Sequence, residues 1–208
     1  DGCTTTLPKK MGILMKRLGV PVVTVITQGA FHRDPLYNML QIRDVKVSAH
    51  VKCIATAEEV KEKSVDELDA LLAESFSFDN FAWQRDNRIS IDVPFRADGL
   101  HRILYKCPKC GAENRMEGKG IQLTCHSCEK QWAMDEYGQL SANVGVTEYP
   151  HIPDWYRWQR ECVRKELEEK EVVNILEDKI VNQNLLARYL KGADKMDSEE
   201  CNNCKLQT

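Results

Sequence analysis

The chain has 208 residues, of which 42% are hydrophobic and 29% are charged, a balance that indicates a globular protein and excludes wholesale disorder. No run of about 18 uncharged apolar residues occurs, which excludes a transmembrane helix. The net charge is −3, but residues 1–52 carry 8 Lys and Arg against 3 Asp and Glu. Such a basic segment suits an anionic small substrate or an anionic membrane surface, with ordinary surface charge as the alternative.

The first elements along the chain predict an α/β domain. Residues 7–18 have apolar side chains at helical spacing, with Pro8 in the first turn and Gly19 as the stop. Residues 20–27 are rich in β-branched side chains and predict a buried strand covered on both faces. Residues 43–54 alternate apolar and polar side chains, which predicts a half-exposed strand at an edge.

Two helix starts follow this strand. Thr56 with Glu59, and Ser64 with Glu67, match the capping box, in which the two side chains satisfy each other's backbone N–H groups. The second helix has one apolar face, which consists of Leu68, Leu71, Leu72 and Phe76. Residues 76–87 add an aromatic cluster that we expect to pack in the core.

We expect three parts: residues 1–100, residues 101–140 and residues 141–208. The third part contains a helix with Asp154 as its N-cap and several aromatic side chains near one face, which we expect to dock on another surface. The end of the chain, from Gly192, is polar and predicts a loose tail.

The most specific motif is a set of four cysteines, two in each of two C-x2-C pairs. Cys107 and Cys110 are followed, after fourteen residues, by Cys125 and Cys128. Four thiolates at this spacing predict a closed, structural Zn²⁺ site, with iron or a redox-active dithiol as the alternatives. His126 lies inside the second pair, but four cysteines already complete the coordination. We therefore expect His126 to lie outside the first shell of ligands.

The residues around the cysteines predict a zinc ribbon. ILYKC, IQLTC and QWAMDEYG read as strands, and MEGKG, with Gly118 and Gly120, reads as the hairpin turn. Residues 101–140 carry 6 Lys and Arg against 5 Asp and Glu. Because phosphate contacts need a basic surplus, this near-neutral charge speaks against nucleic-acid binding. A third pair, Cys201 and Cys204, has no partner pair and reads as an unstructured thiol pair or an adventitious metal site.

Residues 1–30 carry a family resemblance. Asp1-Gly2, then LPKK, then GVPVVTVITQGA resemble the glycerolipid acyltransferase family, which includes the 1-acylglycerol-3-phosphate acyltransferases. FRADGLHRILYKCPKCG and HIPDWYRWQRE resemble a bacterial branch of that family in which a zinc ribbon follows the acyltransferase domain. The resemblance covers roughly residues 1–170. It implies that residues 1–100 are the C-terminal part of an acyltransferase-like α/β domain.

The family's catalytic motif is absent from this chain. It is His-x4-Asp, in which the His is the general base for the acceptor hydroxyl. The five histidines, His32, His50, His101, His126 and His151, are followed five residues later by Tyr, Ala, Lys, Gln and Tyr. The family places this motif before the region matched here, and the chain begins with Asp1 rather than Met. We therefore expect a fragment that lacks the catalytic histidine and has no acyltransfer activity of its own.

The resemblance also implies substrate-binding residues. Lys9 and Lys10 stand where the family has lysines near the phosphate of the acceptor, although Met11 replaces the usual glycine. Arg33 follows the first strand and is a candidate for an anionic group, with a structural turn with Asp34 as the alternative.

In the complete protein the implied reaction transfers a fatty acyl group from an acyl thioester to the hydroxyl of a lysophosphatidate-like lipid. The family resemblance also implies a cytoplasmic protein with peripheral contact at the inner face of the membrane. The alternatives are a non-enzymatic zinc-ribbon module that contacts protein or nucleic acid, and a nonfunctional remnant.

Overall fold

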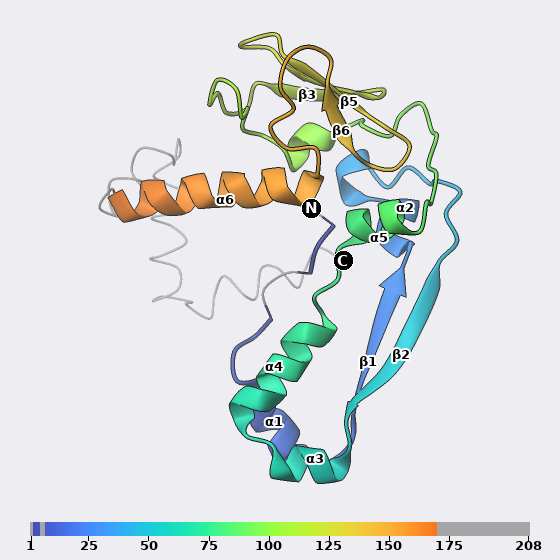
Figure 1. Cartoon of the computed structure of the whole chain (residues 1–208), viewed down its shortest axis with the longest axis vertical. Coiled ribbons are helices and arrows are strands. Elements are labelled where there is room, and N and C mark those ends of the chain that lie inside the picture. The colour runs from blue at the N-terminus through green and yellow to red at the C-terminus, as the bar shows by residue number, and fades with distance from the viewer. Residues whose placement is uncertain (1, 5–6, 170–208) are drawn as a thin grey trace, which may run out of the picture. The chain divides into compact units, whose positions relative to one another are not determined.

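The computed structural model describes residues 2–4 and 7–169. They fall into two compact units, residues 1–159 and a unit that starts at Arg160. The first unit combines short helices with two antiparallel sheets, so the chain has the mixed α and β content that the sequence predicts (Figure 1).

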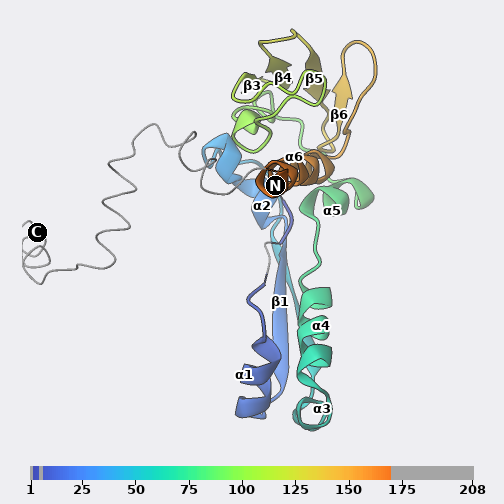
Figure 2. The same ribbon diagram turned by 90° about the vertical axis from the view of Figure 1, so that its left-hand side faces the viewer.

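The N-terminal elements are two strands with helices before, between and after them. In chain order they are α1 (Met11–Leu18), β1 (Val22–Gln28), α2 (Ala30–Arg33), η1 (Leu36–Asn38), β2 (Ser48–Ala55), α3 (Ala57–Glu62), α4 (Val65–Ser75) and α5 (Asn80–Asp86). Helices α1 and α4 lie side by side, as both views show (Figure 2). The backbone N–H of Gly12 donates to the Asp69 carboxylate across this contact, at 2.6 Å.

Helix α1 ends at the predicted residue but starts four residues after the predicted start. Gly19 has φ 61°, and its N–H donates to the Met15 carbonyl at 2.9 Å, so this glycine closes the helix in the left-handed conformation. The helix begins only at Met11, after Lys10 with φ 64°. Pro8 therefore lies before the helix, and its expected place in the first turn is wrong.

The first sheet is a two-stranded ribbon with one open face. Within the described residues, strand β1 pairs only with β2, in antiparallel order, with Val25 opposite Val51. The Thr24 hydroxyl bonds to the Ser75 hydroxyl of α4 at 2.7 Å, so the even-numbered face points to the helix. The other face is open, and Val25 remains 54% exposed. The predicted burial of residues 20–27 on both faces is therefore wrong, because only one layer of helix packs on the ribbon within the described residues.

Both predicted capping boxes are confirmed. The Thr56 hydroxyl accepts from the Glu59 N–H while the Glu59 carboxylate accepts from the Thr56 N–H. Ser64 and Glu67 repeat the arrangement at the start of α4. These reciprocal bonds satisfy N–H groups that the first turn of each helix leaves free, which fixes where α3 and α4 begin.

The second sheet has four antiparallel strands in sequence order. They follow η2 (Leu100–Arg102) and are β3 (Met116–Lys119), β4 (Gln122–Cys125), β5 (Gln131–Met134) and β6 (Leu140–Ala142). The predicted strand IQLTC is confirmed as β4, and of QWAMDEYG only QWAM forms a strand. The prediction of ILYKC as a strand is wrong, because only Lys106 in it makes an isolated bridge, with Glu113. The prediction of MEGKG as a turn is wrong, because MEGK forms β3 and the turn lies at Gly120, with φ 65°. Gly118 serves close packing instead, since a Cβ there would lie 2.3 Å from the Ala97 carbonyl oxygen.

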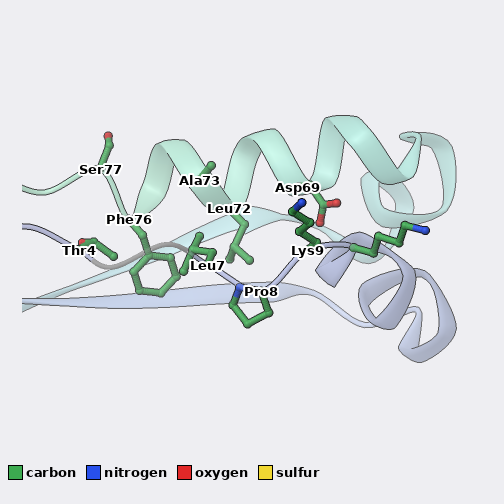
Figure 3. Close-up of a pocket in the computed structure, with 10 residues that line it drawn as sticks. Thr4, Leu7, Pro8, Lys9, Asp69, Leu72, Ala73, Phe76 and Ser77 are labelled. Atoms are coloured by element: carbon green, nitrogen blue, oxygen red, sulfur yellow. The ribbon is translucent and has the colours of Figure 1, made fainter. Parts of the chain in front are cut away.

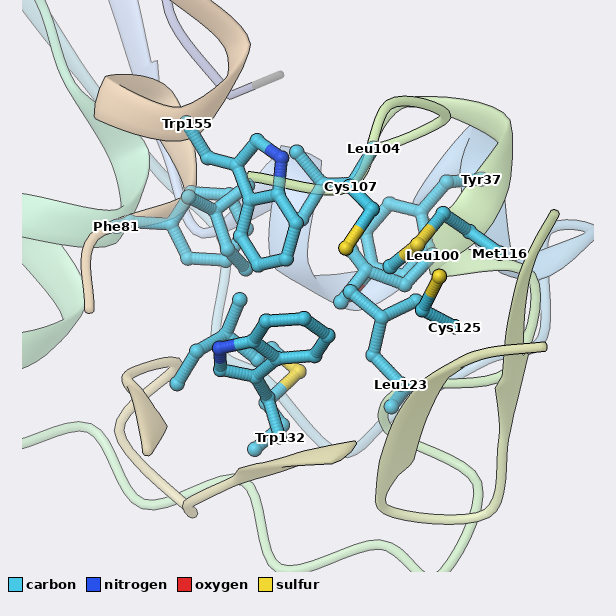
Figure 4. Close-up of a cluster of buried hydrophobic side chains, with 14 residues drawn as sticks. Tyr37, Phe81, Leu100, Leu104, Cys107, Met116, Leu123, Cys125, Trp132 and Trp155 are labelled. Carbon is cyan, nitrogen blue, oxygen red and sulfur yellow. The ribbon is translucent and has the colours of Figure 1, made fainter. Parts of the chain in front are cut away.

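Two separate clusters of buried side chains form inside the first unit. The larger, here called the cysteine core, contains Tyr37, Phe81, Ala97, Leu100, Leu104, Cys107, Met116, Leu123, Cys125, Trp132, Met134, Leu140, Ile152 and Trp155 (Figure 4). The smaller, here called the helix–ribbon core, contains Met15, Ala55, Val60 and Leu68. The cysteine core thus draws on residues before and after position 100. The predicted three-part division of the chain stays a prediction.

Helix α6 (Ile152–Glu169) packs its first two turns on the cysteine core. The Trp155 ring meets the Trp132 ring edge to face, with centroids 5.0 Å apart, and its Nε1–H donates to the Lys106 carbonyl at 2.9 Å. The expected docking of this aromatic face is confirmed for Trp155. Asp154 lies inside the first turn, so its predicted role as the N-cap is wrong. The predicted loose tail and the Cys201–Cys204 pair lie outside the described residues.

Candidate functional site

The four predicted cysteine ligands meet at one point. Their sulfur atoms all lie within 4.8 Å of one another, with Cys107 Sγ 3.7 Å from Cys128 Sγ and Cys110 Sγ 3.8 Å from Cys125 Sγ. Four sulfurs at about 2.3 Å from a central tetrahedral ion lie about 3.8 Å apart. The cysteines are therefore positioned to hold a metal ion, and the donor set is compatible with zinc.

The two C-x2-C pairs have the same backbone hydrogen bonds. The N–H groups of Cys107 and Cys125 donate to the carbonyl oxygens five residues later, at Ala112 and Lys130, each at 2.9 Å. The N–H groups four residues after these cysteines donate back to their carbonyls, at 2.9 Å from Gly111 and 2.8 Å from Glu129. Both donors have positive φ, 74° at Gly111 and 57° at Glu129. The two halves of the site therefore have the same turn. The left-handed position of this turn is occupied by Gly111 in the first half and by Glu129 in the second.

The four thiols differ in burial. Cys107 and Cys125 are fully buried and belong to the cysteine core, whereas Cys110 is exposed and Cys128 is half-buried. Burial raises the pKa of the Cys107 and Cys128 thiols, and a hydrogen bond from the Ala112 N–H lowers that of Cys110. Because metal binding needs the thiolate, protons compete with the ion, and metal affinity falls with decreasing pH.

His126 points away from the sulfur cluster. Its Nε2 lies 2.9 Å from the Glu117 carboxylate, in an exposed contact, and its backbone N–H donates to the Arg115 carbonyl at 2.8 Å. His126 is not in the group of residues that could hold the ion. This geometry agrees with the expectation that four cysteines complete the site.

A cavity of about 520 Å³ lies between the segment before α1 and one side of α4. Its walls are mostly apolar, and both Lys9 and Lys10 line it. Figure 3 shows Lys9 beside Asp69, whose carboxylate also accepts the Gly12 N–H. The remaining lining residues are Thr4, Leu7, Pro8, Leu72, Ala73, Phe76 and Ser77.

Arg33 does not join the two lysines. It is exposed at the end of α2, its backbone carbonyl accepts the Arg43 N–H at 2.7 Å, and it is not among the residues that line the cavity. Asp69 and the apolar walls, which line the cavity with the lysines, are not predicted from the sequence. The sequence assigns Leu72 and Phe76 only to the apolar face of a helix, and nothing in the sequence alone indicates that residues 7–10 lie along that face.

Comparisons of the chain with protein-family models, with curated proteins and with solved structures found no match. Within residues 2–4 and 7–169, no helix combines the length and the apolar character that crossing a membrane requires.

Two other groups of polar side chains lie near α5, one buried and one half-buried. His32 is 1% exposed, its Nε2 lies 2.8 Å from the Asn80 carbonyl, and burial lowers its pKa to about 4. The Asp79 carboxylate caps α5 through the Ala82 N–H and bonds to His151 Nε2 at 2.7 Å. Burial raises the pKa of the nearby Cys3 thiol to about 11, so this cysteine is protonated at neutral pH and has little nucleophilic character.

Proposed function

We propose that Zn²⁺ binds the four cysteines and that residues 101–140 form a zinc ribbon. The support is the cluster of four sulfur atoms at tetrahedral spacing and the repeated turn that carries each pair. The bound ion would join the two turns, and its role is structural because four protein ligands leave no open position for substrate. Cys107 and Cys125 would then couple metal binding to the packing of the cysteine core.

We further propose that the chain is part of a glycerolipid acyltransferase and supplies a binding surface for the lipid acceptor. The observation that carries this proposal is that Lys9 and Lys10 both line one largely apolar cavity. Leu7, Leu72 and Phe76 would contact the acyl chain, and the two ammonium groups would pair with the phosphate. The cavity volume of about 520 Å³ lies within the usual range of small-molecule sites.

In this proposal the residues bind and orient the acceptor, and no residue of this chain acts as the general base. The catalytic His-x4-Asp of the family has no counterpart in the sequence. The purified chain should therefore bind a lysophosphatidate without transferring an acyl group from a thioester. Turnover of an acyl thioester at a rate typical of complete enzymes, about 1 s⁻¹ or more, would contradict this account.

The experiment is isothermal titration of the zinc-loaded chain with 1-oleoyl-lysophosphatidate and, as a matched ligand, 1-oleoyl-lysophosphatidylcholine, both below their critical micelle concentrations. We expect the phosphate monoester to bind more tightly, because its headgroup carries no compensating cation. Replacing Lys9 and Lys10 together by Ala should remove this preference. The control is the double replacement of Lys16 and Arg17, two cationic residues of α1 that do not line the cavity.

Two further variants test the charge beside Lys9 and the space inside the cavity separately. Asp69→Asn keeps an oxygen that can accept the Gly12 N–H and removes a negative charge next to Lys9, so the phosphate should bind more tightly. Ala73→Trp places a large ring in the exposed mouth of the cavity and should weaken both lipids equally. Equal affinity of the two lipids for the native chain would overturn the assignment.

A further inference from the structure

Strand β1 has a free edge without the usual protection. It is the seven-residue sequence VVTVITQ, which contains neither a charged residue nor proline, and its one neighbour among the described strands is β2. Within the described part of the chain, no backbone group of residues 22–28 bonds outside its pairing with β2. Every second N–H and C=O along the other side of β1 is therefore available to another strand.

The other strand edges described here are protected. Strand β2, at the opposite edge of the ribbon, carries His50 and Lys52. In the four-stranded sheet, β3 carries Glu117 and Lys119, and β6 has only three residues. Charges and short strands are the devices by which proteins prevent edge-to-edge pairing. Among the described edges, β1 alone lacks these devices, which indicates that another strand can pair with it.

The exposed face beside this edge is also apolar. The cross-strand pairs on the open face are Val23 with Cys53, Val25 with Val51, and Thr27 with Ala49, and none of these residues is charged. Val23 and Val25 remain 53% and 54% exposed. A strand added to β1 would place its own side chains next to these valines and reduce their exposure to water.

We propose that the occupant is β1 of a second copy of this chain, paired antiparallel across a twofold axis at Val25. This is the register in which all seven residues of β1 find a partner. It places Val25 opposite Val25 of the second copy, Val23 opposite Thr27, and Thr24 opposite Ile26, so no like charges meet. One isologous contact then protects both free edges and makes a four-stranded sheet with β2 of each copy at the outside.

This dimer is independent of the proposed lipid binding, since it uses the strand edge and not the cavity beside α4. A single strand edge buries less surface than the about 1,200 Å² of stable complexes, so the association is weak. We expect it at protein concentrations of about 10–500 µM, in the range of small interfaces.

The test is sedimentation velocity of the zinc-loaded chain over that concentration range, with two matched variants. Val25→Lys puts two ammonium groups opposite each other at the axis and should weaken dimerisation at least about tenfold. Val51→Lys makes the same change on the same exposed face, one strand farther from the edge, and should leave the dimer intact. Circular dichroism and zinc content check that both variants fold.

A monomer at every concentration would overturn the proposal. Equal loss of the dimer in both variants would also overturn it, because it would indicate packing between the open faces rather than the edges. If Val25→Lys does not fold, hydrogen exchange of the native chain decides the question. Alternate amides within residues 22–28 should become more protected as the concentration rises, and exchange that does not depend on concentration would contradict the dimer.

Discussion

The cysteine core and the helix–ribbon core belong to one compact unit but are stabilised in different ways. The cysteine core buries two tryptophans, Trp132 and Trp155, completely, and two of its members are thiols of the candidate metal site. The helix–ribbon core has four buried hydrophobic residues, the largest of which are Met15 and Leu68. On the other face of the ribbon, large apolar side chains remain exposed, including Val23, Val25 and Val51.

The difference shows what each region requires to stay folded. The small sheet of residues 116–142 has short strands, and a bound ion, as proposed above, would add to the order that its buried side chains provide. Among the described residues, the helix–ribbon core contains no group of metal-ligating side chains. It depends on two capping boxes, the Gly12–Asp69 bond and the Thr24–Ser75 bond, and it leaves a sheet face and an edge open.

The largest effect should come from removing a buried ligand. Replacing Cys107 by Ser removes one of four thiolates, and structural zinc sites contribute on the order of 10 kcal/mol to folding. We expect loss of bound zinc and of fixed packing around Trp132 and Trp155, measured as near-UV circular dichroism and metal content. The matched control is Cys53→Ser on the open face of the ribbon, which should change neither. Full zinc content in Cys107→Ser would contradict the site.

The next effect concerns the pH dependence that comes from the buried His32, which packs against Phe81 of the cysteine core. Burial lowers the pKa of His32 to about 4, so between its ordinary pKa of 6.5 and pH 4 the unfolded chain binds a proton that the folded chain does not. Stability should therefore fall as the pH decreases through this window, by about 3 kcal/mol in total. His32→Gln should lose this part of the pH dependence in urea unfolding at several pH values. The same slope in both proteins would contradict the assignment.

A smaller effect should appear only in the helix–ribbon core. Ser64→Ala removes the capping hydroxyl of α4 and should cost about 1 kcal/mol. Hydrogen exchange should become faster in α4 and unchanged in β4 and β5, if the two cores open separately. Equal acceleration in both regions would show that the two cores unfold together.

The smallest effect is a gain in stability at the second turn of the metal site. Glu129 has φ 57°, the position that Gly111 occupies in the first turn. Because a residue with a side chain costs about 1 kcal/mol in this conformation, Glu129→Gly should stabilise the chain slightly. The measurement is the midpoint of thermal unfolding in the zinc-loaded state. Gly111→Glu is the converse variant and should lower the midpoint.

Local patterns in the sequence predict much of this structure. The capping boxes at Thr56 and Ser64, the stop at Gly19 and the cysteine cluster all depend on residues a few positions apart, where side-chain chemistry determines the geometry. The cysteine spacing predicts the candidate metal site because only a converging pair of turns brings four thiols together.

Features that depend on distant segments were not predictable in the same way. Strand β1 looks like a strand covered on both faces because six of its seven residues are β-branched, yet within the described residues helices pack on one face of the ribbon alone. Gly118 looks like a turn residue, but the Ala97 carbonyl twenty-one positions earlier sets its role. The cavity at Lys9 and Lys10 depends on where α4 lies, which no pattern within residues 7–10 reveals.

The most direct test of the account is hydrogen exchange of the reduced, zinc-loaded chain before and after chelation, together with its metal content. We expect one zinc per chain. Removal of the metal should speed exchange in β3, β4 and β5 and in the start of α6, while α4 and its contact with α1 stay protected. Less than half an equivalent of zinc, or equal loss of protection in both cores, would contradict the claim that metal binding by the four cysteines stabilises the cysteine core but not the helix–ribbon core.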